Sequence, residues 1–152
     1  MGLKLATLVY VRRGEYTLML RKARGFQQGK WNGLGGKFAP GESPEACMRR
    51  EVLEESGLHV SEAALKGFIT FPNFDAQDDW YTFVYLVTAF SGEPRASDEG
   101  ELHWVKTAQL SELNLYDGDR IFLPWLERPE VFSAVFRYGT GSVFEGYEVT
   151  FY

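Results

Sequence analysis

The segment from Gly36 to Leu58, GKFAPGESPEACMRREVLEESGL, constrains the fold most, because it combines a bounded helix with an unusual concentration of charge. Ser43 followed by Pro44 is typical of a helix N-terminus, where serine caps a free N–H group and proline fits the first turn. Gly57 is typical of the left-handed residue that ends a helix. The segment therefore predicts a helix from Pro44 to about Ser56.

Three glutamates of this helix place like charges on one side. Glu51, Glu54 and Glu55 fall within an arc of about 100°, while Ala46 and Leu53 fall on another side, which we expect to face the core. Partly buried, each glutamate pair costs about 3 kcal/mol at a separation near 5.5 Å. A solvated acidic face would reduce this cost to tenths of a kcal/mol. A divalent-cation site would remove it, because Mg²⁺ and Mn²⁺ bind carboxylate oxygens together with water and phosphate.

The spacing of the whole segment favours the cation site. It resembles the Nudix box, G-x5-E-x7-R-E-U-x-E-E-x-G-U, in which U is a bulky aliphatic residue. Every specified position is matched, by Gly36, Glu42, Arg50, Glu51, Val52, Glu54, Glu55, Gly57 and Leu58. A chance match is of the order of 10⁻⁷. The resemblance implies a Nudix-type α/β/α sandwich around a mixed sheet, and hydrolysis of a nucleoside diphosphate linked to another group.

The rest of the chain predicts strands on both sides of this helix. Apolar or alternating runs predict strands at 3–11, 16–22, 65–74, 80–90, 103–105, 131–138 and 143–152. Short helices are predicted at 107–113 and 118–127, and the glycine-rich segment 24–42 predicts a loop with at most one short strand. This order favours a mixed α/β or α+β fold. The 152 residues fit one domain, 1–152.

Composition excludes several partners. The net charge of −5 argues against a nucleic-acid partner, which usually requires a basic surface. No run approaches the ~20 apolar residues of a membrane span, so no membrane partner is expected. The single cysteine, Cys47, excludes an intramolecular disulfide and suits the reducing cytoplasm. We expect a monomer that acts on a small molecule.

The Nudix resemblance assigns roles to the acidic residues. The implied ligands of Mg²⁺, for which Mn²⁺ can substitute, are Gly36, Glu51, Glu54, Glu55 and Glu99. These ions would neutralise phosphate charge and activate the attacking water. Glu54 or Glu55 would accept the proton, with Glu99 as an alternative base. Arg50 would hold a carboxylate in place with its rigid guanidinium fork.

A second resemblance, to the animal oxidised-purine nucleoside triphosphatases, covers nearly the whole chain. It is carried by KARGFQQGKWNGLGGK (22–37), by Ser97-Asp98-Glu99, by the aromatic and acidic segment 116–125, and by the closing hairpin. The implied reaction is hydrolysis of a nucleoside triphosphate to a monophosphate and pyrophosphate. The implied substrates are 8-oxo-dGTP and 2-hydroxy-dATP, as in MutT-like sanitation of the nucleotide pool.

This resemblance also implies a base pocket. Asn32 would read the base edge, because a carboxamide has both donors and an acceptor. Phe26, Phe71 and Trp80 would form apolar or stacking walls. The other implied substrate contacts are Thr7, Lys22, Gly35, Gly36, Tyr116 and Asp119.

The chain departs from these enzymes at 116–119. They carry a tryptophan and two adjacent aspartates, whereas here Tyr116 replaces the tryptophan, Gly118 replaces the first aspartate and Asp119 keeps the second. Two neighbouring acids can share one proton and so act as donor or acceptor. We therefore expect a narrower or different base preference, unless Asp117 compensates.

Other functions remain open. Ordinary dNTPs, dinucleoside polyphosphates, ADP-ribose and capped RNA suit the same chemistry. A start directly at the first strand weighs against ADP-ribose, and the charge of −5 weighs against capped RNA. A non-catalytic nucleotide-binding domain would usually lose box glutamates, and none is missing. Prenyl diphosphate isomerases of this fold use a cysteine and a glutamate outside the box, whereas Cys47 lies inside it.

Overall fold

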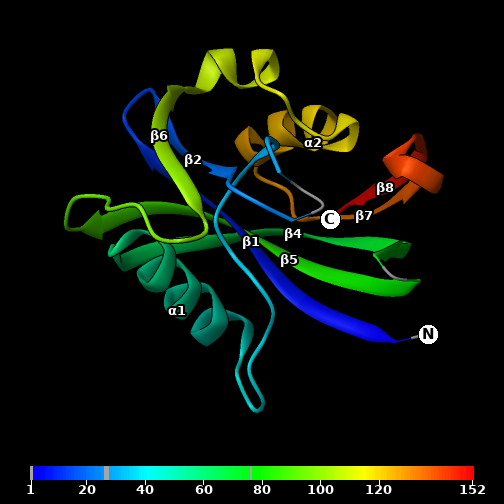
Figure 1. The fold of residues 1–152 in the computed structure, drawn as a ribbon, viewed down its shortest axis with the longest axis horizontal. Helices are drawn as coiled ribbons and strands as arrows, with labels where there is room; N and C mark the ends of the chain where they lie inside the picture. The colour runs from blue at the N-terminus through cyan, green and yellow to red at the C-terminus, as the bar shows by residue number, and fades with distance from the viewer. Residues whose placement is uncertain (1, 26–27, 76) are drawn as a thin grey trace.

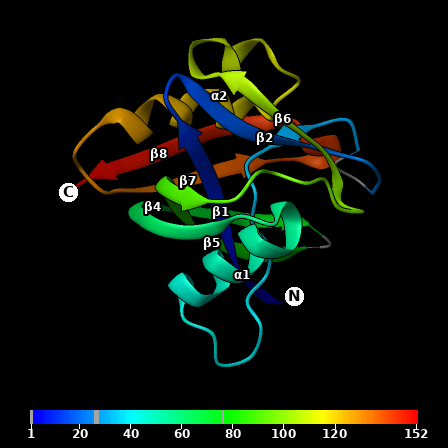
Figure 2. The same cartoon turned by 90° about the vertical axis from the view of Figure 1, so that its left-hand side faces the viewer.

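The computed structural model describes residues 2–25, 28–75 and 77–152. Its strands are β1 (Leu3–Arg13), β2 (Tyr16–Lys22), β3 (Trp31–Asn32), β4 (His59–Asp75), β5 (Asp78–Ser91), β6 (Gly100–Lys106), β7 (Phe132–Tyr138) and β8 (Phe144–Phe151). Its α-helices are α1 (Pro44–Ser56) and α2 (Asp117–Phe122), and its 3₁₀ helices are η1 (Thr107–Glu112), η2 (Leu123–Glu127) and η3 (Thr140–Ser142). Figure 1 shows α1 and α2 on opposite sides of the strands, and Figure 2 shows the same layers from the side.

The strands form one mixed sheet with β1 near its middle. The order is β3-β2-β1-β5-β4-β7-β8, with β6 paired to β2. The pairs β1–β5 and β4–β7 are parallel, and the other pairs are antiparallel. The mixed sheet that the Nudix resemblance implies is therefore confirmed.

Each face of the sheet carries its own apolar core. On one face, Met48 and Val52 of α1 belong to a buried cluster with Val9 of β1. On the other face, Phe122 of α2 belongs to a buried cluster with Tyr10 of β1. Val9 and Tyr10 serve opposite cores because successive side chains of a strand point to opposite faces. The predicted α/β/α sandwich is confirmed.

Helix α1 begins and ends where the sequence predicts. The Ser43 hydroxyl accepts the backbone N–H of Ala46 at 3.1 Å, and Pro44 occupies the first turn. Gly57 is left-handed, with φ of 78°, and its N–H donates to the carbonyl of Leu53. Local cap chemistry is sufficient to fix both ends of this helix.

The predicted core face of α1 is wrong. Leu53 is 42% exposed and Ala46 is also exposed, because the side of the helix that carries Met48 and Val52 packs on the sheet. Because α1 is rotated about its axis relative to the predicted orientation, Glu55 is almost completely buried, with 4% of its surface exposed.

Two other elements differ from prediction for identifiable reasons. The helix predicted over 118–127 is α2 only to Phe122, and η2 continues from Leu123 because Pro124 has no N–H for an α-helical bond. Strand β4 starts earlier than predicted, at His59, and its pairing with β5 shifts register repeatedly. These irregularities hide the alternation that reveals a strand in sequence.

Within the described part of the chain, the helices lack the length and hydropathy that a membrane crossing needs.

Candidate active site

A cavity of about 610 Å³ lies beside the central strand β1 and contains most of the predicted site residues. Those that line it are Thr7, Lys22, Asn32, Gly35, Gly36, Glu51, Glu55, Phe71, Trp80, Glu99, Tyr116 and Asp119. Arg50 and Glu54 are described by the structure but are not among its lining residues. Phe26 lies outside the described residues, so its predicted role stays a prediction.

Arg50 organises the acidic end of this cavity from behind. Its Nε and Nη2 donate to the two carboxylate oxygens of Glu42 at 2.6 and 2.9 Å. Its Nη1 donates to Glu51 at 2.8 Å and to Glu54 at 3.1 Å, and Nη2 also donates to the Lys37 carbonyl at 3.0 Å. The bonds from Arg50 lower the pKa of Glu42 to about 2. The guanidinium therefore holds several carboxylates in fixed positions.

A glycine loop separates the glutamates of α1 from β1. The Glu55 carboxylate accepts the backbone N–H of Gly35 at 2.7 Å. A Cβ at Gly36 would lie 2.7 Å from the Glu51 carboxyl group, so glycine is needed for Glu51 to occupy this position. The loop is tied to the sheet by the N–H of Thr7, which donates to the Gly36 carbonyl at 2.9 Å. The absence of side chains at Gly35 and Gly36 thus lets Glu51 and Glu55 of α1 approach the loop and line the cavity.

Burial, with repulsion from neighbouring carboxylates as a smaller cause, raises the pKa of both glutamates. Burial raises the pKa of Glu55 to about 8, and the charges of Glu51 and Glu99 add to the rise, although the Gly35 N–H and Lys22 oppose it. Burial also raises the pKa of Glu51, against the opposing bond from Arg50. Lys22 and Glu99 form an ion pair at 3.4 Å. This end of the cavity therefore has a net deficit of positive charge.

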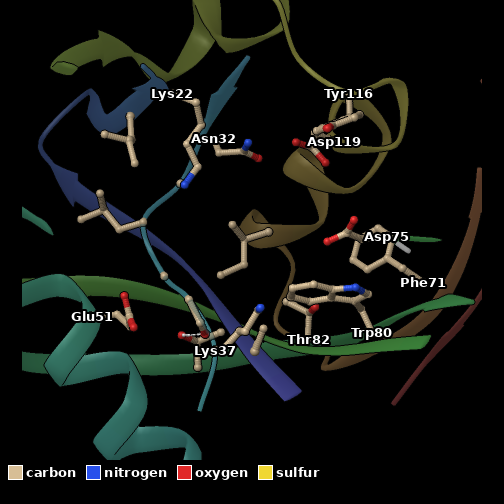
Figure 3. A pocket seen from close by; sticks show the side chains of 18 of the residues that line it. Lys22, Asn32, Lys37, Glu51, Phe71, Asp75, Trp80, Thr82, Tyr116 and Asp119 are labelled. Atoms are coloured by element: carbon tan, nitrogen blue, oxygen red, sulfur yellow. Dashed lines mark hydrogen bonds between the residues drawn. The ribbon is translucent and has the colours of Figure 1, made fainter. Parts of the chain in front are cut away.

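The other end of the cavity is aromatic and contains a buried carboxyl group. Figure 3 shows the side chains of Asn32 and Asp119 directed towards each other, with Phe71 and Trp80 on another wall. The ammonium group of Lys37 lies 5.5 Å from the Trp80 ring centroid. Asp119 is 5% exposed, and within the described residues its Oδ2 has no hydrogen-bond partner. Burial raises the pKa of Asp119 to about 7, with Lys30 and Arg120 opposing the rise.

Comparison with known proteins agrees with this geometry. The NUDIX domain model matches residues 2–126. The chain belongs to the Nudix family. It is 34% identical over 146 residues to the oxidized purine nucleoside triphosphate hydrolase of Danio rerio, covering 96% of this chain and 90% of the relative. It is 33% identical over 135 residues to the Mus musculus protein of the same name, covering 89% and 86%.

A solved structure extends the similarity to the fold. The Mutator MutT protein from Bacillus halodurans superposes with a TM-score of 0.87 at 29% identity, covering 96% of this chain and 97% of that one. This Nudix protein is a hydrolase that acts on phosphoanhydride bonds, as its family membership and its MutT-like relatives show.

The donor set of this Nudix hydrolase fits a hard divalent cation. Within residues 2–25, 28–75 and 77–152, no three Asp, Glu, His or Cys side chains are grouped so that they alone could hold a metal ion, so an ion here needs ligands from water and substrate. Mg²⁺ usually binds one or two carboxylates and takes its other ligands from water and substrate phosphates, so Glu51, Glu55 and Glu99 suit it. Glu54 has a side chain that is 58% exposed and bonded to Arg50, and its predicted roles as metal ligand and base stay predictions.

Several residues that line the cavity were not predicted from the sequence. They are Lys37, Phe74, Asp75, Thr82 and Tyr138. Only Lys37 had a local signal, since it ends the glycine-rich stretch. The others reach the cavity through strand register or sheet position, which sequence does not reveal. Asp117 does not compensate for Gly118 in the cavity, because its side chain is 67% exposed and paired with Arg120.

Arg50→Lys should impair hydrolysis without removing the positive charge. Lysine lacks the planar fork and holds fewer carboxylate oxygens in fixed positions. We expect kcat/KM to fall by about 10–100-fold, as is typical when the partner of a ligating group is lost. Steady-state kinetics at saturating Mg²⁺ would measure this. The matched control is Arg137→Lys, whose native arginine pairs with Glu148 on the surface; equal rates in both variants would contradict the role of Arg50.

Asp119→Asn should stabilise the fold more at pH 8 than at pH 5. The folded-state pKa of Asp119 is about 7 and its ordinary value is 3.8, so between these values the wild-type folded state retains a proton that the unfolded state has lost. Wild-type stability therefore falls as pH rises through this window, and asparagine has no such loss. We expect the unfolding free energy of Asp119→Asn, relative to that of the wild type, to increase by about 2–3 kcal/mol from pH 5 to pH 8.

Urea unfolding at the two pH values measures this difference. Asp117→Asn is the matched control, because that side chain is mostly exposed. A pH-independent effect of Asp119→Asn would show that the carboxyl group is not penalised by burial.

Proposed function

We propose that this Nudix hydrolase converts oxidised purine nucleoside triphosphates, such as 8-oxo-dGTP or 2-hydroxy-dATP, to monophosphates and pyrophosphate. The proposed cofactor is Mg²⁺, for which Mn²⁺ can substitute. The supporting observation is a single cavity with clustered glutamates at one end and an aromatic wall with a buried carboxyl group at the other. The names of the Danio rerio and Mus musculus relatives support this substrate class.

The two ends of the cavity set the direction in which substrate binds. Glu51 and the aromatic residues Phe71 and Trp80 lie on different sides of the cavity in Figure 3. The polyphosphate belongs beside Glu51, where Lys22 can bind its negative charge. The base belongs beside the aromatic side chains, because stacking contributes about 1–3 kcal/mol per base.

The residues at the acidic end have different proposed roles: cation binding, positioning of a carboxylate, and proton acceptance. A divalent cation, when bound, supplies charge neutralisation to the phosphate oxygens. Glu51 and Glu99 offer oxygens for it, and Arg50 fixes Glu51 in position. Glu55, whose pKa is about 8 without a cation, would be ionised once a divalent cation lies beside it, and it would then accept the proton of the attacking water. The Gly35 N–H holds one of its oxygens, and the other retains acceptor capacity.

The same proposal includes a monomer in the cytoplasm that binds a small nucleotide, without a nucleic-acid or membrane partner. The net charge of −5 and the single cysteine support it.

A nucleotide panel tests the substrate. Purified protein is supplied with 8-oxo-dGTP, 2-hydroxy-dATP, dGTP, dATP, a dinucleoside polyphosphate or ADP-ribose, with Mg²⁺, Mn²⁺ or chelator, and the nucleotide products are separated and quantified together with released pyrophosphate and phosphate. We expect kcat/KM for an oxidised purine triphosphate to exceed that for its unmodified parent by at least about ten-fold. We also expect no activity in chelator. Equal turnover of all triphosphates, or a preference for ADP-ribose, would overturn the proposed substrate.

Glu55→Gln tests the assignment of the proton acceptor. The amide oxygen of glutamine can still accept the Gly35 N–H, so the fold should be retained, which a thermal melt would check. We expect kcat to fall by about 10²–10⁴-fold, because glutamine cannot accept a proton from water at neutral pH. The matched control is Glu62→Gln, an exposed position of β4. An unchanged kcat would remove Glu55 from this role.

A further inference from the structure

Tyr138 occupies the space that a side chain at position 118 would need. A Cβ at Gly118 would lie 2.6 Å from the Tyr138 hydroxyl oxygen and 2.8 Å from Cδ1 of Phe136. The backbone of Gly118 is outside the left-handed region, so its conformation does not require glycine. Glycine is needed here because β7 brings a tyrosine hydroxyl against the first turn of α2.

The Tyr138 hydroxyl has one of its hydrogen-bonding functions already used. The backbone N–H of Gly118 donates to it at 2.7 Å. Within the described part of the chain, the structure shows no acceptor for the hydroxyl's own proton. A hydroxyl that accepts one bond is polarised and becomes a stronger donor. Tyr138 is 7% exposed and lines the cavity, so a ligand in the cavity is the natural acceptor.

Aromatic packing fixes the position of this donor. The Tyr138 ring lies 5.7 Å from Tyr116 and 5.6 Å from Phe74, both in edge-to-face geometry, and 5.4 Å from Phe144. Tyr116 and Phe74 also line the cavity. The hydroxyl therefore belongs to a rigid wall, as a specific recognition group requires.

Asp119 supplies the complementary group. It follows Gly118 in α2, lines the same cavity, and has a buried oxygen without a partner within the described residues. Burial and then the charge of Asp119 raise the pKa of Tyr138, so the tyrosine keeps its proton. The cavity thus presents a fixed donor near a carboxyl acceptor, and it suits a ligand whose acceptor and donor are adjacent.

We propose, building on the proposed purine triphosphate substrate, that Tyr138 is a specificity-determining residue that selects 6-oxopurine nucleotides over 6-aminopurine nucleotides. Its hydroxyl donates to the carbonyl oxygen at C6, and Asp119 accepts the adjacent ring N–H. A 6-aminopurine presents N–H groups in place of this carbonyl and meets the Tyr138 proton with another donor. Among the proposed substrates, 8-oxo-dGTP belongs to the selected class and 2-hydroxy-dATP does not.

Equilibrium binding of monophosphates tests this selection without depending on hydrolysis. Calorimetry compares 8-oxo-dGMP, dGMP, 2-hydroxy-dAMP and dAMP on the wild type and on Tyr138→Phe, which removes only the hydroxyl. We expect affinity for the two 6-oxopurines to fall by about ten-fold, the usual value of one hydrogen bond, and affinity for the two 6-aminopurines to change less than about two-fold. A uniform fall, no change, or no binding of any of the four to the wild type would overturn the proposal.

A second variant displaces the Tyr138 hydroxyl by changing its neighbour in α2 instead of the tyrosine itself. Gly118→Ala places a methyl group 2.6 Å from the Tyr138 oxygen, which is too close for van der Waals contact, so the hydroxyl must shift and the 6-oxopurine preference should also be lost. In the double variant with Tyr138→Phe, the loss of preference should not exceed that of either single variant. Additive losses would show that the two residues act independently and would overturn the proposal.

Tyr85→Phe is the matched control for the loss of a buried hydroxyl. Tyr85 is 2% exposed, donates to Glu45 at 2.6 Å, and belongs to the core on the α1 side of the sheet. The Tyr85→Phe variant should lose about as much stability as Tyr138→Phe and keep the 6-oxopurine preference. Loss of that preference in Tyr85→Phe would overturn the proposal.

The proposal and the proposed reaction can fail separately. Tyr138-dependent binding of 6-oxopurine monophosphates without hydrolysis of any triphosphate would overturn the reaction and retain the specificity. Hydrolysis of 8-oxo-dGTP with a base preference that Tyr138→Phe leaves unchanged would overturn the specificity alone.

Discussion

The bonds from Arg50 to the glutamates around it are the interaction on which the active site depends. Its donors are directed to both oxygens of Glu42, to Glu51 and Glu54, and to the Lys37 carbonyl. A guanidinium group engaged in this way is not available for a phosphate, so Arg50 acts by positioning carboxylates. It reduces the repulsion around Glu51 but leaves Glu55 buried without an equivalent cation, and burial raises the pKa of Glu55 to about 8. That remaining imbalance suits an ion that arrives with the substrate phosphates.

The same arrangement connects the acidic end of the cavity to the base end. Leu34 and Gly36 are hydrogen-bonded to β1, through Val9 and Thr7 respectively, so the loop after β3 cannot move independently of the sheet. Asn32 stands just before this loop. Asn32 and the loop that contacts Glu51 and Glu55 are therefore held as one short segment against the central strand, which fixes the distance between the two ends of the cavity.

Local features of this protein could be predicted from sequence, and features that depend on packing could not. The caps of α1 and the box glutamates follow from short-range chemistry. The buried side of α1 does not, because few apolar residues mark it and contact with the sheet decides between Leu53 and Val52. Tyr138 meets Gly118 across twenty positions of sequence, and only the placement of β7 against α2 brings them together. Sequence reveals a missing side chain at 118, whereas the structure shows what fills its space.

The group that fills this space would account for the narrow base preference that we propose. Two neighbouring acids that share a proton can present either donor or acceptor to a base, because the proton can move between them. The Tyr138 hydroxyl lacks this freedom: burial and the charge of Asp119 keep it protonated, and the Gly118 N–H orients it. A hydroxyl that can only donate, beside one carboxyl group, favours a base that presents a hydrogen-bond acceptor next to a donor. On the proposed specificity, the cavity therefore recognises a narrower range of bases through a change at one position of α2.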